Sequence, residues 1–293
     1  MNEKVLITGG TGLLGTDLAL ILKHSYRTMP VSSVQFDIRK YDDIISFFKN
    51  SQPGIVLHAA AWADVDACEK DKEKAMAINA DGAGNIARAC KKIGARMIYY
   101  STDYVFDGQK GAFYVETDET NPVNIYGLSK LEGEKRVLDI LDDAAVMRIS
   151  WLFGTARDNF VTRTLKDGRD KFQAKLKGEK VEPIQVIHDQ KSCPTWTIDI
   201  ADQTKAIIEN KLSGIIHAAS TNEASRYDLA DMIFEEVAWD LELQPMKMSD
   251  YNFVAPRPPR TPLENKRLND SGLSVMRDYR EALREFLMVY QDK

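Results

Sequence analysis

The residues best suited to chemistry are a tyrosine and a lysine four positions apart, Tyr126 and Lys130 in the segment YGLSK. On a helix, residues i and i+4 share one face, so both side chains reach toward the same site. A nearby ammonium favours the phenolate, and we expect it to lower the tyrosine pKa from its usual value of about 10. A tyrosine tuned in this way suits proton delivery near neutral pH. A solvated, charged helix is the alternative, because this spacing alone is common.

The first glycines of the chain predict a dinucleotide site. Gly9, Gly12 and Gly15 have the spacing G-x-x-G-x-x-G, after an apolar run at 5–8 and before leucines at helical spacing. Strand, tight turn and helix form the context that a dinucleotide-binding glycine motif requires. The glycines let the backbone approach a pyrophosphate, and the helix start offers free N–H groups. An ordinary strand-to-helix turn is the alternative.

The choice between NADH and NADPH stays open. Asp37 stands 22 positions after Gly15, where an acid often binds the ribose of NAD. The predicted second strand covers residues 27–31, however, and no acid ends it. Asp37 follows a further apolar stretch at 34–36. A helix cap or a turn is the other use of such an acid.

Composition excludes several classes of protein. The chain has 293 residues, 44% of them hydrophobic and 28% charged, as in an ordinary globular protein. Its net charge of −5 gives no basic field for nucleic acid. The four histidines and three cysteines show no metal-ligand spacing and no C-x-x-C motif, so we expect no metal and a reducing cytoplasm. No apolar run approaches the ~20 residues of a membrane span. The predicted first strand starts so early that we expect no signal peptide.

Strand-like and helical segments alternate over the first half of the chain. This alternation predicts an α/β fold of the Rossmann type, with a doubly wound parallel sheet and a smaller C-terminal substrate-binding lobe. We expect residues 1–150 to form the dinucleotide-binding domain and residues 151–293 to form mainly the lobe. Segments near 185–218 should return to the main sheet.

Ligands of such sheets bind beyond the C-terminal ends of the strands. Gly9, Ala59, Thr102 and Ser150 all stand at predicted strand ends, so we expect them to converge on one site. The strongly charged segment 170–180 is predicted to be an exposed helix or a lid.

Longer motifs give a resemblance that spans nearly the whole chain. They resemble the dTDP-4-dehydrorhamnose reductase family, which are extended short-chain dehydrogenase/reductases acting on sugar nucleotides. The segments that carry the resemblance are GGTGLLG (9–15), HAAAWADVDACEKD (58–71), AINADGAGNIA (77–87), STDYVFDG (101–108), YGLSKLEGE (126–134), RISWLFG (148–154), HDQKSCPT (188–195) and RPPRTPL (257–263). Several of these are far more specific than the glycines.

The resemblance implies that a 4-keto sugar on thymidine diphosphate is reduced, with NADPH or NADH giving a hydride to sugar C4. It implies that Tyr126 protonates the C4 oxygen and that Lys130 binds the nicotinamide ribose and lowers the tyrosine pKa. Thr102 would hydrogen-bond near the reacting oxygen. A positioned proton donor typically accelerates such a step ~10²–10⁴-fold. A strand-end cap is the alternative for Thr102.

The resemblance also implies two sets of contacts. The expected cofactor contacts, besides Tyr126 and Lys130, are Gly9, Thr11, Gly12, Leu13, Leu14, Asp37, Ile38, Ala60, Ala61 and Trp62. The expected substrate contacts are Thr102, Asp103, Trp151, Asn159, Arg257 and Arg260, with Asp189 and Gln190 as weaker candidates. The aromatic face of Trp151 suits a deoxysugar, and the two arginines suit diphosphate oxygens. The alternatives are a turn acid at Asp103, a core tryptophan and a solvated basic loop.

Two features depart from the family pattern. The segment 170–180 is longer than the usual linker, and Trp62 stands where smaller or polar residues are more usual. The ligands of the magnesium-dependent dimer known in parts of the family have no match here. We do not expect the magnesium-dependent arrangement, and a homodimer is one alternative for the oligomeric state.

Two rival functions remain. A sugar-nucleotide epimerase or dehydratase uses the same scaffold, but dehydratases typically place a glutamate after Thr-Asp, where this chain has Tyr104. A non-catalytic nucleotide-binding subunit, like that of methionine adenosyltransferase, is the second rival. The intact set of Thr102, Tyr126 and Lys130 favours catalysis.

Overall fold

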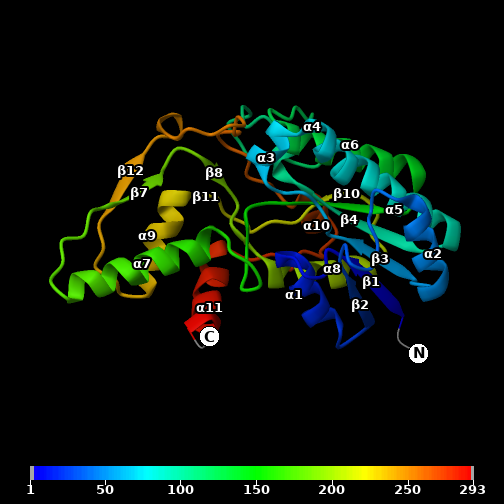
Figure 1. Cartoon of the computed structure of the whole chain (residues 1–293), viewed down its shortest axis with the longest axis horizontal. Coiled ribbons are helices and arrows are strands. Elements are labelled where there is room, and N and C mark those ends of the chain that lie inside the picture. Colours follow the sequence, from blue (N-terminus) through cyan, green and yellow to red (C-terminus); the bar gives the residue numbers. More distant parts are fainter. Residues whose placement is uncertain (1–2, 292–293) are drawn as a thin grey trace.

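The fold is built on a six-stranded parallel sheet (Figure 1). The computed structural model describes residues 3–291. In spatial order the strands are β10 (Gly214–His217), β5 (Ala145–Ile149), β4 (Arg96–Thr102), β3 (Ile55–His58), β1 (Lys4–Thr8) and β2 (Arg27–Val31). The chain runs from β1 outward to β2 and then crosses to β3 on the other side of β1, so the winding direction reverses beside β1. The prediction of a Rossmann-type α/β fold is confirmed.

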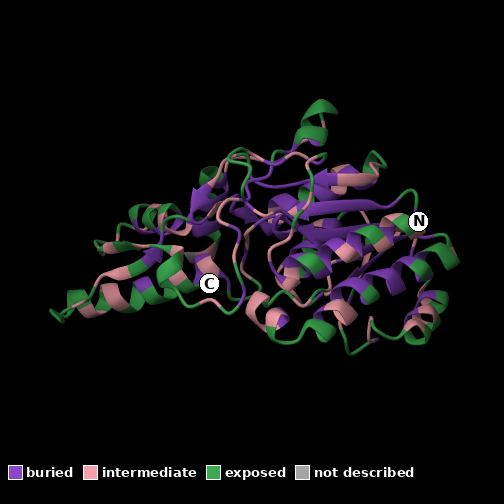
Figure 2. Cartoon of the chain, turned by 90° about the horizontal axis from the view of Figure 1, so that it is seen from above, coloured by how far each residue is buried: buried purple, intermediate pink, exposed green. Residues whose placement is uncertain are grey.

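Helices cover both faces of this sheet. One face carries α1 (Leu13–Leu22) and α8 (Thr197–Glu209), and the other carries α2 (Tyr41–Ser51), α5 (Gly82–Ile93) and α6 (Ile125–Ile140). Along β1, Val5 and Ile7 belong to the first core and Leu6 to the second, because successive strand side chains alternate between faces. Figure 2 shows the strands buried between helices whose outer sides are exposed. A sheet covered on both sides requires such apolar strands.

The segment between β3 and β4 contains an irregular helical region. It comprises α3 (Val65–Lys70), α4 (Lys72–Ala75), a π-helix (Met76–Asp81) and then α5. The composition of residues 69–94 favours one helical region with an interruption near 79–84, and the structure places that interruption slightly earlier, as a π-helix at Met76–Asp81. Such π-helical turns occur often at functional sites. Here the π-helix contains Asn79, which is 1% exposed.

The smaller lobe stands apart at the left of Figure 1. Its elements are α7 (Phe160–Leu176), α9 (Arg226–Glu236), α11 (Tyr279–Gln291), β7 (Ile184–Ile187) and β12 (Leu243–Met246), with β7 and β12 paired in parallel. Its core includes Phe286, whose ring packs edge-on against Phe153 at 5.3 Å and Trp196 at 6.1 Å between centroids. The charged segment at 170–180 continues α7 as far as Leu176.

The chain leaves and re-enters the lobe several times. After α7 and β7, the helix α8 packs against α1, and β10 forms an edge of the main sheet. A short helix, α10 (Lys266–Asp270), then packs against β10 before the chain reaches α11. Two short strand pairs lie along these crossings, β6 (Leu152–Phe153) with β9 (Thr195–Trp196) and β8 (Lys191–Ser192) with β11 (Ala224–Ser225).

Two further observations concern residues 3–291. None of the helices there combines the length and the apolar composition needed to cross a bilayer. No cluster of histidine, cysteine or acidic side chains there has an arrangement that would hold a metal ion.

Candidate active site

A cavity of about 960 Å³ lies at the C-terminal ends of β1, β3, β4 and β5. Its wall extends from the glycine turn to the start of α7 in the lobe. Of the residues expected at the site, those that line it are Gly9, Thr11, Gly12, Leu13, Leu14, Asp37, Ile38, Ala60, Ala61, Trp62, Thr102, Asp103, Tyr126, Lys130, Trp151 and Asn159. The structure thus brings together residues that are up to 150 positions apart in the sequence.

The glycine turn fits a dinucleotide. Gly9 has φ +67°, which favours glycine, and a Cβ there would lie 2.8 Å from the amide nitrogen of Ala60. A Cβ on Gly15 would lie 2.2 Å from the Gly9 carbonyl oxygen. Gly12 caps α1 and has no side chain to occupy the first N–H groups of the helix. A pyrophosphate therefore has both backbone access and the positive end of a helix dipole.

Tyr126 and Lys130 lie on the first two turns of α6. Asn124 caps this helix, and its side chain accepts a hydrogen bond of 2.8 Å from the Gly127 N–H. The Lys130 ammonium donates to the Tyr100 carbonyl at 2.6 Å and lies 4.1 Å from the centre of the Tyr99 ring. The lysine is only 2% exposed. Both side chains line the cavity, because they lie on the same face of α6.

The pKa of Tyr126 differs from the sequence expectation. Burial raises it well above 10, whereas a hydrogen bond with Thr102 lowers it and the Asp103 carboxylate raises it further. Burial also lowers the pKa of Lys130 from 10.5 to about 7, against an opposing contribution from Glu134. The pKa of Tyr126 is therefore raised and not lowered as predicted, because burial of the phenol outweighs the other contributions.

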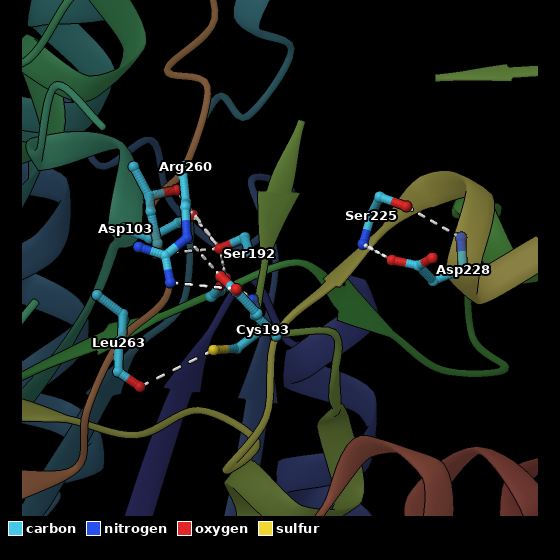
Figure 3. Close-up of polar contacts among 10 residues, drawn as sticks. Asp103, Ser192, Cys193, Ser225, Asp228, Arg260 and Leu263 are labelled. Atoms are coloured by element: carbon cyan, nitrogen blue, oxygen red, sulfur yellow. Dashed lines mark hydrogen bonds and ion pairs between the residues drawn. The ribbon is translucent and has the colours of Figure 1, made fainter. Parts of the chain in front are cut away.

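Thr102 and Asp103 end β4 in a buried network. The Thr102 hydroxyl accepts from the Tyr104 N–H at 3.2 Å and donates to Asp103 at 3.2 Å. Asp103 also accepts from the Ser192 and Thr261 hydroxyls at 2.8 and 2.6 Å (Figure 3). Burial raises the pKa of Asp103 while these three donors lower it. Asp103 thus ties β4 to two segments near the lobe, in addition to facing the cavity.

Asp37 lies at the other end of the cavity. Its carboxylate forms a paired contact with the Arg39 guanidinium, with a shortest distance of 2.6 Å. This hydrogen bonding lowers the pKa of Asp37. Ile38 next to it packs against α5, and its carbonyl accepts from Asn85 at 3.0 Å. The cavity wall also contains Ser32 and Arg39, which the sequence reasoning did not single out.

Trp151 and Asn159 lie on the lobe side. Trp151 has φ +38°, an uncommon backbone conformation for a bulky residue, where the chain turns from β5 into β6. The Asn159 side chain caps α7, because its oxygen accepts from Val161 and Thr162 and its nitrogen donates to Gly154 and Arg157. Asn159 therefore shapes the wall with a side chain that is already hydrogen-bonded.

The two arginines of the proline-rich loop lie in different surroundings. Arg257 lines a second, adjoining cavity together with Gln190, and forms an ion pair of 3.0 Å with Asp66. Arg260 lines neither cavity and makes two contacts with Glu223, of 2.8 and 3.1 Å. Asp189 also lies outside both cavities and accepts from the Met248 N–H at 2.7 Å. The structure thus does not bring Arg260 or Asp189 to the site.

Sequence reasoning missed Asn79 as a positioning residue. Its side chain accepts from the Trp62 N–H at 2.8 Å and donates to the Trp62 carbonyl at 3.1 Å and the Ser129 hydroxyl at 2.9 Å. It therefore joins the loop over the cofactor cavity to the helix that carries Tyr126 and Lys130. The signal that the sequence offers is the segment AINADGAGNIA (77–87), in which Asn79 stands.

A Rossmann sheet with a tyrosine and a lysine beside a dinucleotide-sized cavity defines a short-chain dehydrogenase/reductase, a class of oxidoreductases. Residues 3–292 match the family described as RmlD substrate binding domain. The chain belongs to this family, and the resemblance seen in the sequence is confirmed.

Three similar proteins illustrate the family. The dTDP-4-dehydrorhamnose reductase of Mycolicibacterium smegmatis is 37% identical over 97% of this chain and 85% of its own length. The dTDP-4-keto-6-deoxy-D-glucose reductase of Streptomyces niveus is 32% identical, over 97% of this chain and 96% of its own. The crystal structure of dTDP-4-dehydrorhamnose reductase from Bacillus anthracis in complex with NADP is 31% identical and has a TM-score of 0.93, covering 98% of this chain and 99% of that one.

Proposed function

We propose that this protein uses NADPH or NADH to reduce the 4-keto group of a dTDP-4-dehydro-6-deoxyhexose, converting dTDP-4-dehydrorhamnose to dTDP-rhamnose. The observation that carries this proposal is that Thr102, Tyr126 and Lys130 line the same cavity as the glycine turn. Relatives named for this reaction include the one at 37% identity. The bound dinucleotide supplies the hydride that goes to sugar C4.

The residues of the chain supply the proton and the alignment. The raised pKa of Tyr126 keeps its phenol protonated, so the hydroxyl is ready to donate to the oxygen at C4 as negative charge develops there. Thr102 lies beside Tyr126 on the cavity wall, and its hydroxyl would help to orient the phenol toward the C4 oxygen. Lys130, one helical turn further on, would hold the ribose hydroxyls of a bound dinucleotide with its amino group. With a pKa of about 7, Lys130 is also able to relay a proton toward Tyr126 near neutral pH.

The rival functions receive less support from the site. Elimination would need an additional acid or base next to Asp103, and the residue there, Tyr104, has a pKa raised by burial. Its ring packs edge-on against Tyr126 with 6.0 Å between centroids and lines only the adjoining second cavity, so it supports Tyr126 and does not face the site itself. A purely regulatory nucleotide-binding subunit would not require Thr102, Tyr126 and Lys130 to line the dinucleotide cavity together.

The experiment compares the wild type with Tyr126→Phe on dTDP-4-keto-6-deoxy-L-mannose, following oxidation of NADPH and of NADH. We expect Tyr126→Phe to bind the dinucleotide normally and to lose ~10²–10⁴-fold in kcat. Tyr114→Phe is the matched control, because Tyr114 is buried outside both cavities. A Tyr126→Phe variant with near wild-type kcat would exclude this tyrosine as the proton donor. Stoichiometric loss of reduced dinucleotide separates a reductase from an epimerase or dehydratase.

A further inference from the structure

The Lys130 ammonium is buried without an acidic partner. Within residues 3–291, the one hydrogen bond of this ammonium goes to the Tyr100 carbonyl at 2.6 Å, and no carboxylate pairs with it. Glu134, one helical turn further along α6, is held by Arg148 with a shortest distance of 2.7 Å. A buried cation without a paired charge is costly unless another group attracts it. Another group must therefore hold the ammonium in place.

The aromatic ring of Tyr99 meets this requirement. The Lys130 Nζ lies 4.1 Å from the centre of the ring. The face of an aromatic ring carries negative charge and attracts a cation at this distance, most strongly where water is excluded. Tyr99 is fully buried, so the attraction acts in a medium of low dielectric constant.

The Tyr99 ring is fixed from several sides. Its hydroxyl donates to the carbonyls of Asn79 and Lys130, at 3.3 and 3.4 Å. The ring stacks on His58, its neighbour on β3, with 5.7 Å between centroids and 23° between planes. Gly133 lets α6 come close, because a Cβ there would collide with the Tyr99 hydroxyl and lie 2.6 Å from the Asn79 carbonyl oxygen. The ring therefore has little freedom to move away from the ammonium.

His58 connects this stack to the glycine turn. Its Nδ1 shares a hydrogen bond of 2.7 Å with the Thr8 hydroxyl, which also accepts from the Ala60 N–H at 3.3 Å. Burial, together with the charge of Lys130, lowers the pKa of His58 to about 3, so the imidazole is neutral and does not repel the ammonium. The stack thus joins the lysine to the strand ends beside the predicted pyrophosphate site.

We propose that Tyr99 is a positioning residue, whose ring face holds the Lys130 ammonium on the cavity wall while His58 fixes the ring. The contact belongs to the free protein, and its effect on turnover rests on the proposed function. The titratable groups around the lysine are Tyr99 from β4, His58 from β3, and Tyr126 and Glu134 from α6. The charge of Glu134 is balanced by its ion partner. A weaker ring face would therefore change the environment of the ammonium and leave its charged neighbours in place.

The experiment follows the protonation of Lys130 by NMR, from the ε-carbon signals of isotope-labelled lysine in the full chain. The Lys130 signal is the one missing from Lys130→Met. Position 99 carries phenylalanine (Tyr99→Phe) or phenylalanine with one, two or three ring fluorines. These rings are similar in size, but each fluorine withdraws charge from the ring face and weakens its attraction for a cation. Because the ring favours the charged form, we expect the Lys130 pKa to fall stepwise, by about one unit from Tyr99→Phe to the trifluorinated ring.

A second tyrosine provides the matched control. Tyr41 also stacks with a cation, Arg88 at 4.7 Å, but lines neither cavity. Tyr41→Leu should leave the Lys130 titration unchanged. The pH profile of kcat/KM with NADPH and dTDP-4-keto-6-deoxy-L-mannose should shift toward lower pH across the fluorinated series, in step with the NMR titration.

The outcomes separate this inference from the reductase function. A Lys130 pKa that stays constant or rises with added fluorine would overturn it. A change already present in Tyr99→Phe that does not grow with fluorine would assign the effect to the hydroxyl and overturn it too. If the NMR titration shifts stepwise while the wild type reduces no 4-keto sugar, the ring contact stands and the reductase proposal fails.

Discussion

Replacing Lys130 by methionine tests how strongly the site desolvates its ammonium. The lysine is 2% exposed, and burial lowers its pKa from 10.5 to about 7. Between these two values the unfolded chain binds a proton that the folded chain does not, so stability rises with pH. Each pKa unit corresponds to about 1.4 kcal/mol. The wild type should therefore gain about 2 kcal/mol between pH 7 and pH 9 from this group alone, because the lysine is already half-deprotonated at pH 7, whereas Lys130→Met should not.

The assay is urea denaturation of both proteins at pH 7, 8 and 9, with the difference in unfolding free energy plotted against pH. We expect Lys130→Met to be most favoured relative to the wild type at pH 7 and to lose that advantage as the pH rises. Lys135→Met is the control, since Lys135 is exposed on the same helix and pairs with Glu132. A difference between Lys130→Met and the wild type that stays constant with pH would refute the argument that Lys130 is desolvated.

Three further outcomes are expected. Gly15→Ala should raise the Kd for NADPH at least ~10-fold, because the new Cβ would lie 2.2 Å from the Gly9 carbonyl oxygen and displace the glycine turn. Fluorescence titration would measure the Kd, and a normal affinity would show that the turn does not need to approach the dinucleotide closely. Glu134→Gln should lower the free energy of unfolding by about 3–5 kcal/mol, because it leaves the buried Arg148 without its ion partner. Chemical denaturation would measure the change, and a loss below about 1 kcal/mol would contradict this prediction. Asn79→Ala should lower kcat/KM and raise the KM for NADPH by freeing the backbone at Trp62, with a steady-state assay as the readout; unchanged kinetics would limit Asn79 to a structural role.

The fold and most of the cavity wall could be predicted from local patterns. The parallel sheet follows from alternating strand-like and helical segments, and residues such as Gly9, Thr102 and Trp151 stand next to predicted strand ends. Because parallel strands place their C-terminal ends at one edge, residues distant in sequence meet there without any knowledge of loop conformation.

Features that depend on pairing in space were less accessible. Arg260 looked available for a ligand because its partner, Glu223, comes from a segment 37 positions away. Tyr99 attracted no notice in the sequence, since only the fold places its ring 4.1 Å from the Lys130 ammonium. The direction of the Tyr126 pKa was predicted from the nearby lysine alone, whereas burial has the larger effect. The helical pattern indicates an interruption near residue 79, but it does not show that the turn is π-helical or that Asn79 points toward Trp62 and Ser129.

The repeated crossing between the two lobes constrains how this enzyme could be re-engineered. Exchanging everything after residue 150 with a relative would also replace β10, the edge strand beside β5, and α8, which packs against α1, so both contacts would join side chains that do not match. A transplant that respects the architecture would have to be discontinuous. It would exchange the segments around α7 and α9 separately and keep the native chain between them. The substrate lobe would then change while α8 and β10 keep their native contacts with the main sheet.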